Sequence, residues 1–156
     1  MKACVCAVGR LAPRSEERAL TDDYMARYAP LARRLGWGPL TETEIETRKV
    51  QGMAAEAAEL RRALPSGALT VALDERGRTL TSPDFAERLR GWADQGRDVA
   101  FVIGGADGID PGLRAEADFA LSFGKMVWPH KLVRVMLAEQ LYRAASILTG
   151  APYHRE

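Results

Sequence analysis

Short apolar runs alternate along the chain with longer segments in which apolar residues recur every three or four positions. The short runs have the length of buried strands, and the longer segments have the period of helices with an apolar face. This alternation predicts an α/β fold with a mostly parallel sheet flanked by helices. Strands are expected over residues 2–8, 40–45, 68–73, 98–103, 119–123 and 126–128, and helices over 14–28, 48–64 and 129–150, with two more beginning at Ser82 and Asp110.

Proline and glycine mark the ends of these elements. Ser82-Pro83 and Asp110-Pro111 each join a capping side chain to a proline that suits the first turn of a helix. Gly96 follows the last apolar residue of the helix that begins at Ser82. Pro30 and the segment 36–39, which holds two glycines and a proline, predict a loop after the first helix.

Three predicted loops follow strands and have unusual composition. They are residues 73–77, 104–108 and 121–130. In parallel sheets, ligands bind at loops beyond the carboxyl ends of the strands, so these loops are candidates for a binding site. The Gly-Gly-Ala-Asp-Gly segment at 104–108 fits neither the dinucleotide nor the mononucleotide glycine fingerprint. Its bare backbone can approach a flat ligand or another loop, and it equally suits a tight structural turn.

The composition is that of an ordinary globular chain. It is 47% hydrophobic and 28% charged, which excludes disordered and low-complexity classes. Twenty-two Lys and Arg against 21 Asp and Glu give a net charge of +1, so an RNA site would be local rather than a broad basic surface. Apolar stretches are too short for a membrane span and no targeting segment is visible, which predicts a cytoplasmic protein without membrane contact.

Cysteine and histidine give little sign of metal or redox chemistry. Cys4 and Cys6 are the two cysteines, and their alternate positions place them on one side of the first predicted strand. We interpret them as small buried apolar residues. Both histidines, His130 and His154, lie near the C-terminus without the spacing of a zinc site, so no metal is expected.

The last predicted helix carries one wide apolar face and a second apolar group that points elsewhere. A helix covered on more than one side suggests an interface between copies of the chain. Arg134 lies within the wide face, where it either reaches water along its aliphatic stem or serves a function. His130, at the helix start, is interpreted as packing there. The tail Tyr153-His154-Arg155 is a polar and aromatic cluster that suits either a function or a disordered end.

Six segments together resemble the bacterial large-subunit ribosomal RNA pseudouridine N3-methyltransferases, a family of α/β-knot (SPOUT) enzymes. The resemblance spans essentially the whole chain in matching order, and the C-terminal half is its most specific part. The segments are Val8-Gly9-Arg10-Leu11, Leu73-Asp74-Glu75-Arg76-Gly77, Ile103-Gly104-Gly105-Ala106-Asp107-Gly108, Pro129-His130-Lys131-Leu132-Val133-Arg134-Val135, Glu139-Gln140-Leu141-Tyr142-Arg143-Ala144 and Pro152-Tyr153-His154-Arg155.

This resemblance implies a single domain over residues 1–156, with a Rossmann-like sheet and a C-terminal trefoil knot. It implies S-adenosylmethionine bound between the three loops, a homodimer formed through the last helix, and ribosomal RNA within the assembled ribosome as substrate. Gly124 and Val127 stand where the family often has Ser and Thr, so backbone groups would hold the adenine there. The implied cofactor residues are Leu73, Gly104, Gly105, Gly108, Gly124, Lys125, Met126, Val127, Trp128 and Pro129.

Methyl transfer to a uracil nitrogen needs a proton acceptor or a group that stabilises the developing anion, so we hypothesise that Arg134 steadies an anionic oxygen or phosphate and that His154 accepts a proton or binds RNA. Tyr153 would stack on a base and Arg155 would grip a phosphate. Two other function classes stay open. One is a non-catalytic RNA-binding ribosome factor of the same fold, and the other is a nucleotide-binding module such as a flavodoxin-like protein.

Overall fold

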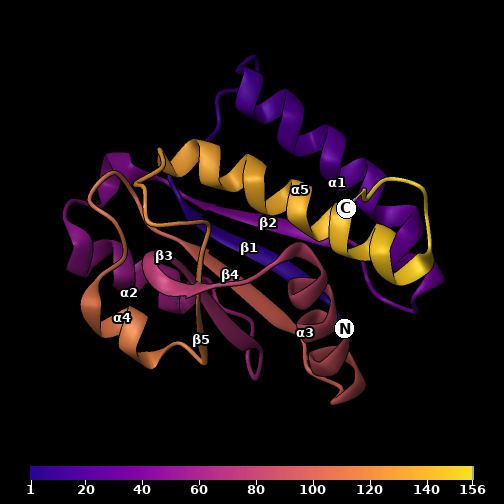
Figure 1. Ribbon diagram of the computed structural model, residues 1–156. Coiled ribbons are helices and arrows are strands. Elements are labelled where there is room, and N and C mark those ends of the chain that lie inside the picture. Colours follow the sequence, from indigo (N-terminus) through magenta and orange to yellow (C-terminus); the bar gives the residue numbers. More distant parts are fainter. Residues whose placement is uncertain (156) are drawn as a thin grey trace.

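The computed structural model describes residues 1–155 and contains a five-stranded sheet with helices on both faces (Figure 1). The strand order is β2-β1-β4-β3-β5, and every neighbouring pair is parallel, so all carboxyl ends lie along one edge. The strands are β1 (Ala3–Val8), β2 (Leu40–Ile45), β3 (Leu69–Thr79), β4 (Val99–Ile103) and β5 (Phe119–Ser122), and the helices are α1 (Glu16–Arg34), η1 (Thr47–Lys49, a 3-10 turn), α2 (Met53–Ala63), α3 (Ser82–Asp94), α4 (Pro111–Glu116) and α5 (His130–Thr149).

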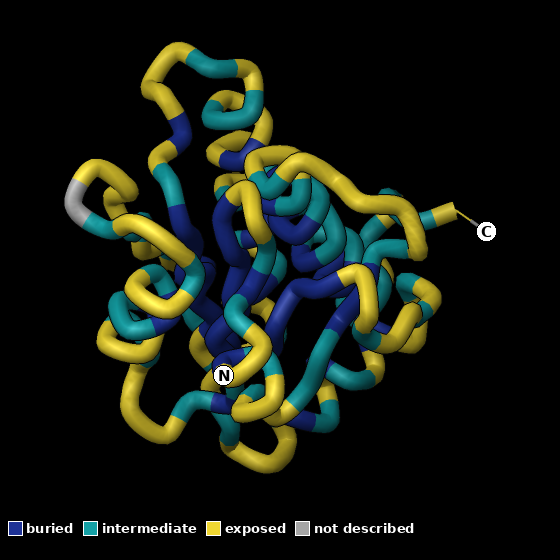
Figure 2. Tube along the Cα trace, turned by 90° about the vertical axis from the view of Figure 1, so that its left-hand side faces the viewer, coloured by how far each residue is buried: buried dark blue, intermediate teal, exposed yellow. Residues whose placement is uncertain are grey.

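Alternate residues of the central strands supply two hydrophobic cores, one on each face of the sheet. The buried stretches of chain lie in the interior, surrounded by more exposed segments (Figure 2). On one face, Phe101 of β4 and its neighbours pack against α1, α3 and α5. On the other face, Cys6 and Val102 pack against α2 and α4. Cys4 and Cys6 are free thiols within the second core, which confirms their interpretation as buried apolar residues.

Helix α5 lies over the first face of the sheet and packs chiefly against α1 and α3 (Figure 1). It runs from the carboxyl edge of the sheet, at His130, to Gly150, whose left-handed backbone ends it. The described part of the chain, residues 1–155, holds no helix with both the length and the apolar character that crossing a membrane requires.

The sequence pattern predicted most helices and strands correctly, but several of their ends lie elsewhere in the structure. The first helix continues through Pro30 to Arg34, so the predicted break at the proline is wrong. The second helix begins at Met53 rather than residue 48, because Gly52 has a φ of +87° that no helix can contain. Thr81, not Ser82, caps α3. Residues 126–128 form an exposed loop and no strand, because no neighbouring strand pairs with them.

Strand β3 runs six residues beyond its predicted end at Leu73, to Thr79. Leu73 and Arg78 both pair with Leu121, so residues 74–77 bulge out between them, and the pairing with β5 then continues through Thr79 and Ser122. The two backbones approach closely at Gly77, where a Cβ atom would lie 2.7 Å from the carbonyl carbon and oxygen of Ala120. A glycine is therefore required at this close approach of the two strands. The trefoil knot itself stays a prediction.

Candidate functional site

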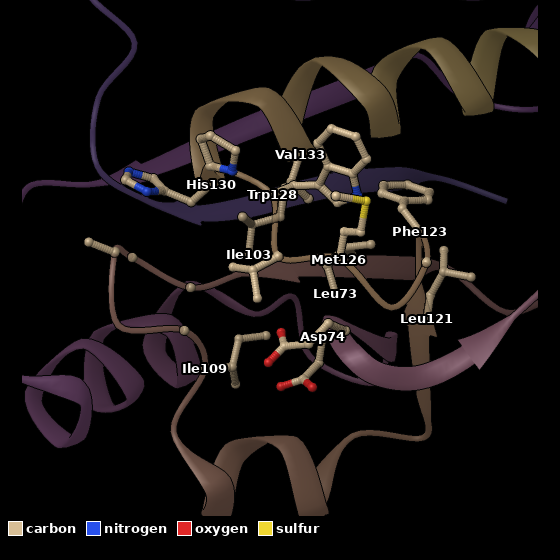
Figure 3. A pocket seen from close by; sticks show the side chains of 18 residues that line it. Leu73, Asp74, Ile103, Ile109, Leu121, Phe123, Met126, Trp128, His130 and Val133 are labelled. Atoms are coloured by element: carbon tan, nitrogen blue, oxygen red, sulfur yellow. The ribbon is translucent and has the colours of Figure 1, made fainter.

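A cavity of about 470 Å³ opens at the carboxyl edge of β3, β4 and β5 (Figure 3). The structure brings all three predicted loops together around it. Its walls are mostly apolar, with Asp74 and Ile109 on one side and Trp128, His130 and Val133 on the other (Figure 3). It is lined by Leu73, Asp74, Glu75, Ile103, Gly104, Gly105, Ala106, Gly108, Ile109, Leu121, Phe123, Gly124, Met126, Val127, Trp128, Pro129, His130 and Val133.

Bare backbone forms the wall contributed by the loop after β4. A Cβ atom on Gly104 would lie 2.5 Å from the carbonyl carbon and oxygen of Gly108, so the loop folds back on itself at this point only because Gly104 has no side chain. The amide of Gly108 donates to the carbonyl of Gly105 at 3.0 Å, and Gly108 has a φ of +87°. The glycine-rich sequence thus produces a closed turn whose backbone faces the cavity.

The loop after β5 is held by Ser122, which the sequence gave no reason to single out. Its buried hydroxyl donates to the Gly124 carbonyl at 2.8 Å and accepts from the Gly124 amide at 3.1 Å. It also donates to the carbonyl oxygen of Glu75 at 3.1 Å, which links the loop to the bulged part of β3. Beyond this anchor, Met126 and Val127 are 73% and 79% exposed, so the loop presents apolar side chains at the mouth of the cavity.

Asp74 is the buried acid of the cavity. Burial alone would raise its pKa, but hydrogen bonds from the side chain and backbone of Arg76 and from Arg114 outweigh that effect and hold the pKa below its ordinary value. The carboxylate is therefore ionised at neutral pH. Glu75, beside it, is half exposed and lines the same wall. Arg76 and Arg114 pair with Asp74, and Arg76 also lies 3.8 Å from Glu75, so the two carboxylates are balanced by arginines of the protein.

His130 lines the opposite wall at the first turn of α5. Its Nε2 atom lies close to Gly9, at 3.6 Å from where a Cβ of that residue would stand. Burial, and then the positive charges of Lys131 and Arg134, lower the pKa of His130 below its ordinary value, so the imidazole is neutral at pH 7. The interpretation of His130 as mere packing at the helix start leaves out this position on the cavity wall.

Arg134, predicted to be catalytic, is absent from the cavity lining among the described residues. Its side chain is 1% exposed, and its guanidinium donates to Glu42, Glu44 and the Gly9 carbonyl. The direct hold on an anionic oxygen of a ligand stays a prediction, and in this structure these donors bind groups inside the protein. Lys125 is likewise absent from the lining, whereas every other predicted cofactor residue is part of it.

The C-terminal tail folds back on the later turns of α5 rather than on the cavity. The Tyr153 hydroxyl donates to Glu139 at 2.9 Å, and Arg143 lies 4.7 Å above the Tyr153 ring. Arg143 Nη1 is 3.2 Å from His154 Nδ1. Burial, followed by the carboxylate of Glu139, raises the pKa of Tyr153, so its phenol stays protonated. Arg155 is exposed.

A parallel α/β sheet with a largely apolar cavity at its carboxyl edge, walled by glycine backbone, defines a ligand-binding protein of the nucleotide-binding kind. The match to known families makes the class specific. Residues 1–154 match the family described as "Predicted SPOUT methyltransferase", and the chain belongs to this family. It is a methyltransferase of the α/β-knot class.

Full-length relatives agree with this assignment. The chain is 67% identical to the protein named "Ribosomal RNA large subunit methyltransferase H" of Roseobacter denitrificans, over 99% of each chain. It is 62% identical to the protein of the same name from Paracoccus denitrificans, over 100% of each. Among solved structures, a probable methylase family protein from Haemophilus influenzae Rd KW20 has a TM-score of 0.52 at 10% identity, covering 99% of this chain and 70% of that one, which is a likeness of fold.

Proposed function

We propose that this protein transfers a methyl group from S-adenosylmethionine to N3 of a pseudouridine in large-subunit ribosomal RNA, acting on assembled ribosomes in the cytoplasm. Family membership establishes the methyltransferase class. The ribosomal RNA substrate is supported by relatives of 60–67% identity that carry the name "Ribosomal RNA large subunit methyltransferase H". The net charge of +1 favours a structured particle over free RNA, because broad electrostatic attraction to phosphates is lacking.

The observation that carries this proposal is the cradle of bare backbone at 104–108 facing the apolar loop 124–129. S-adenosylmethionine carries a flat adenine, and the cavity pairs a side-chain-free wall with apolar side chains against which such a ring can pack. We therefore place the cofactor against the loops at Leu73, Gly104–Gly108 and Gly124–Pro129. The chemistry that bound S-adenosylmethionine supplies there is an electrophilic methyl group.

His154 would take part as a hydrogen-bond donor. Arginine has no acceptor, so the contact between Arg143 Nη1 and His154 Nδ1 requires that Nδ1 accept, which leaves the proton on Nε2. A neutral imidazole in this tautomer donates from Nε2. When the N3 proton passes to solvent water, negative charge spreads onto the neighbouring carbonyl oxygens of the base, and a donor aimed at one of them would stabilise it. This arrangement favours binding of the RNA base over the proton acceptance that was the other predicted role of His154.

A homodimer would bring the tail to a cavity. Within one chain, Glu139 lies about 14 Å along α5 from His130, and Tyr153 and His154 pack beyond it, away from their own cavity. Leu132 and Met136 lie one turn apart on one side of α5, and neither belongs to a hydrophobic core of the described residues. A second copy packed on this side would cover them and place Tyr153, His154 and Arg155 beside the neighbouring cavity, where they would contact RNA.

The proposal is tested by incubating the purified protein with labelled S-adenosylmethionine and ribosomes, followed by mass spectrometry of the ribosomal RNA. We expect one methyl group on a large-subunit pseudouridine, and binding of S-adenosylhomocysteine in calorimetry. Methylation of isolated RNA in preference to ribosomes would contradict the substrate assignment. Cofactor binding without transfer to any ribosomal RNA would instead support a non-catalytic RNA-binding factor of this fold.

A further inference from the structure

A cluster of four charged side chains lies between α5, α1 and β2. Arg134 Nη1 is 2.9 Å from Glu42 and 2.6 Å from Glu44, and Arg18 binds Glu42 with both terminal nitrogens at 3.0 and 2.9 Å. Arg134 is 1% exposed and the two carboxylates are 10% and 23% exposed, so the cluster is largely withdrawn from water. Burial alone would raise the pKa of Glu42, but the hydrogen bonds and charges of Arg18 and Arg134 outweigh it and lower the pKa, which keeps this carboxylate ionised.

Arg134 also binds the loop that leaves β1. Its Nη2 atom donates to the Gly9 carbonyl at 2.7 Å and lies 3.5 Å from the Val8 carbonyl. Glu44, the carboxylate that Arg134 shares, accepts from the amide of Leu11 at 2.7 Å. The loop is therefore held on both sides of Arg10, through a carbonyl and through an amide. Arg18 makes no such bond to this loop among the described residues.

The loop after β1, which Arg134 binds, also packs against His130. Gly9 lies beside the imidazole, since its Cβ would stand 3.6 Å from His130 Nε2. His130 precedes Arg134 by one helical turn, so both residues belong to the same end of α5. Arg134 thus ties the first turns of α5 to the backbone that the imidazole packs against. The other side of His130 forms part of the cavity wall.

Stability alone is a weak reason for this arrangement. Withdrawing several charges from water is unfavourable, and apolar side chains of similar volume often stabilise a protein equally well in such places. Arg134 Nε is buried without a partner among the described residues, which adds a further unfavourable contribution. What apolar packing cannot supply is direction, because hydrogen bonds to two carboxylates and a carbonyl fix the relative position of three elements.

We infer that Arg134 is a positioning residue: from behind the cavity wall it holds the β1 loop and the first turn of α5 together, and so fixes His130 against the bound cofactor or base. This inference rests on the proposed function for the identity of the cavity's ligand. The position of His130 in the free protein can be measured without any ligand, so the two claims fail separately.

The test uses the full chain, in which the imidazole signals of only two histidines appear in an NMR spectrum. Arg134→Met removes the hydrogen bonds while keeping an aliphatic stem. Arg18→Met is the matched control, because it removes a cation from the same cluster without releasing the β1 loop. A His130→Gln spectrum assigns the signals. Each variant is also examined for thermal unfolding and for binding of S-adenosylhomocysteine.

We expect Arg134→Met to shift or broaden the His130 signals and to weaken S-adenosylhomocysteine binding about tenfold, while Arg18→Met changes the affinity less than about twofold. Arg134→Lys keeps the charge but has one ammonium for three sites, so it should move the His130 signals as well. If Arg134→Met does not fold, the His130 signals of Arg134→Lys decide whether Arg134 positions His130.

Two results would overturn the inference. One is a folded Arg134 variant whose His130 signals match those of the unaltered protein. The other is an equal disturbance of His130 by Arg18→Met, which would reduce Arg134 to a general contributor to stability. Failure of the unaltered protein to bind S-adenosylhomocysteine would count against the proposed function, while the spectra of the free protein would still decide the role of Arg134.

Discussion

Gly104 is the residue on which the backbone wall of the cavity most directly depends. A methyl group at this position would meet the Gly108 carbonyl at 2.5 Å, closer than any real contact, so the turn would have to open. We predict that Gly104→Ala weakens S-adenosylhomocysteine binding at least about tenfold in calorimetry. The control is Gly91→Ala in α3, where a Cβ meets nothing within 4 Å and alanine favours the helix. Equal affinity in both variants would refute the role of the turn.

Asp74 makes the stability of the protein depend on pH. The pKa of its carboxyl is lower in the folded chain than the ordinary value of 3.8, so the folded state favours the ionised form. This contribution is fully present above about pH 4 and is lost as the pH falls through the folded pKa. We predict that Asp74→Asn lowers the free energy of unfolding in urea at pH 7 and that the difference shrinks below pH 4. A difference that grows on acidification would contradict this.

The sequence alone identified some residues of the cavity and its surroundings and gave no indication of others. The glycines at 104–108 were identifiable because three glycines in five residues are unusual, and Asp74 could have been found as an acid that directly follows a buried strand. Arg134 was identifiable as a charge within an apolar helix face, but its partners were not. Ser122 gave no signal, since a serine at a strand end is common and its hydrogen bonds appear only in the folded chain.

At the scale of elements, β3 differs most from expectation. The sequence from Asp74 to Gly77 has the charged, glycine-ended character of a turn, and these residues do bulge out of the pairing, but β3 then resumes beside β5 at Arg78 and Thr79. Pro30 in α1 is a similar case. The proline lies in the last turns of a helix whose packing against α5 continues past it.

The close approach of β3 and β5 can be tested at Gly77. A Cβ there would lie 2.7 Å from the carbonyl carbon and oxygen of Ala120. These are backbone atoms of a paired strand, so they cannot move aside as the end of a flexible side chain could. We predict that Gly77→Ala destabilises the protein by about 2 to 3 kcal/mol in equilibrium unfolding. Gly91→Ala serves again as the control and should raise stability by up to about 1 kcal/mol. An unchanged midpoint of unfolding for Gly77→Ala would mean that the two strands do not approach this closely.

At the scale of the molecule, the cavity and the tail cluster lie at different places along α5. Their separation within one chain is the structural reason for proposing a dimer. A groove of about 610 Å³ lies between α1, α3 and α5, and Leu20, Tyr24 and Met136 are among the residues that line it. Glu139, which accepts a hydrogen bond from Tyr153 of the tail, lines the same groove. A second copy would cover this apolar surface.

The dimer predicts a concentration-dependent mass. Leu132 is 39% exposed at the start of α5, and a carboxylate there would have to be buried on association. We predict that Leu132→Glu shifts the protein from dimer to monomer in light scattering, with loss of methyl transfer. Lys131→Glu, one position away, changes the charge without removing an apolar contact and should keep the dimer. An unaltered protein that is monomeric at every concentration would contradict the composite site.

The amino-acid sequence alone was sufficient for the alternation of strands and helices, the parallel sheet, the glycine turn and the family, because these depend on periodicity and short motifs. The meeting of loops at one cavity, the continuation of β3 along β5 and the role of Arg134 required the folded chain. Arg134 reaches Glu42 and Glu44 across separations of 92 and 90 residues. Periodicity and capping act over a few residues, whereas such contacts exist only after the sheet has brought distant segments together.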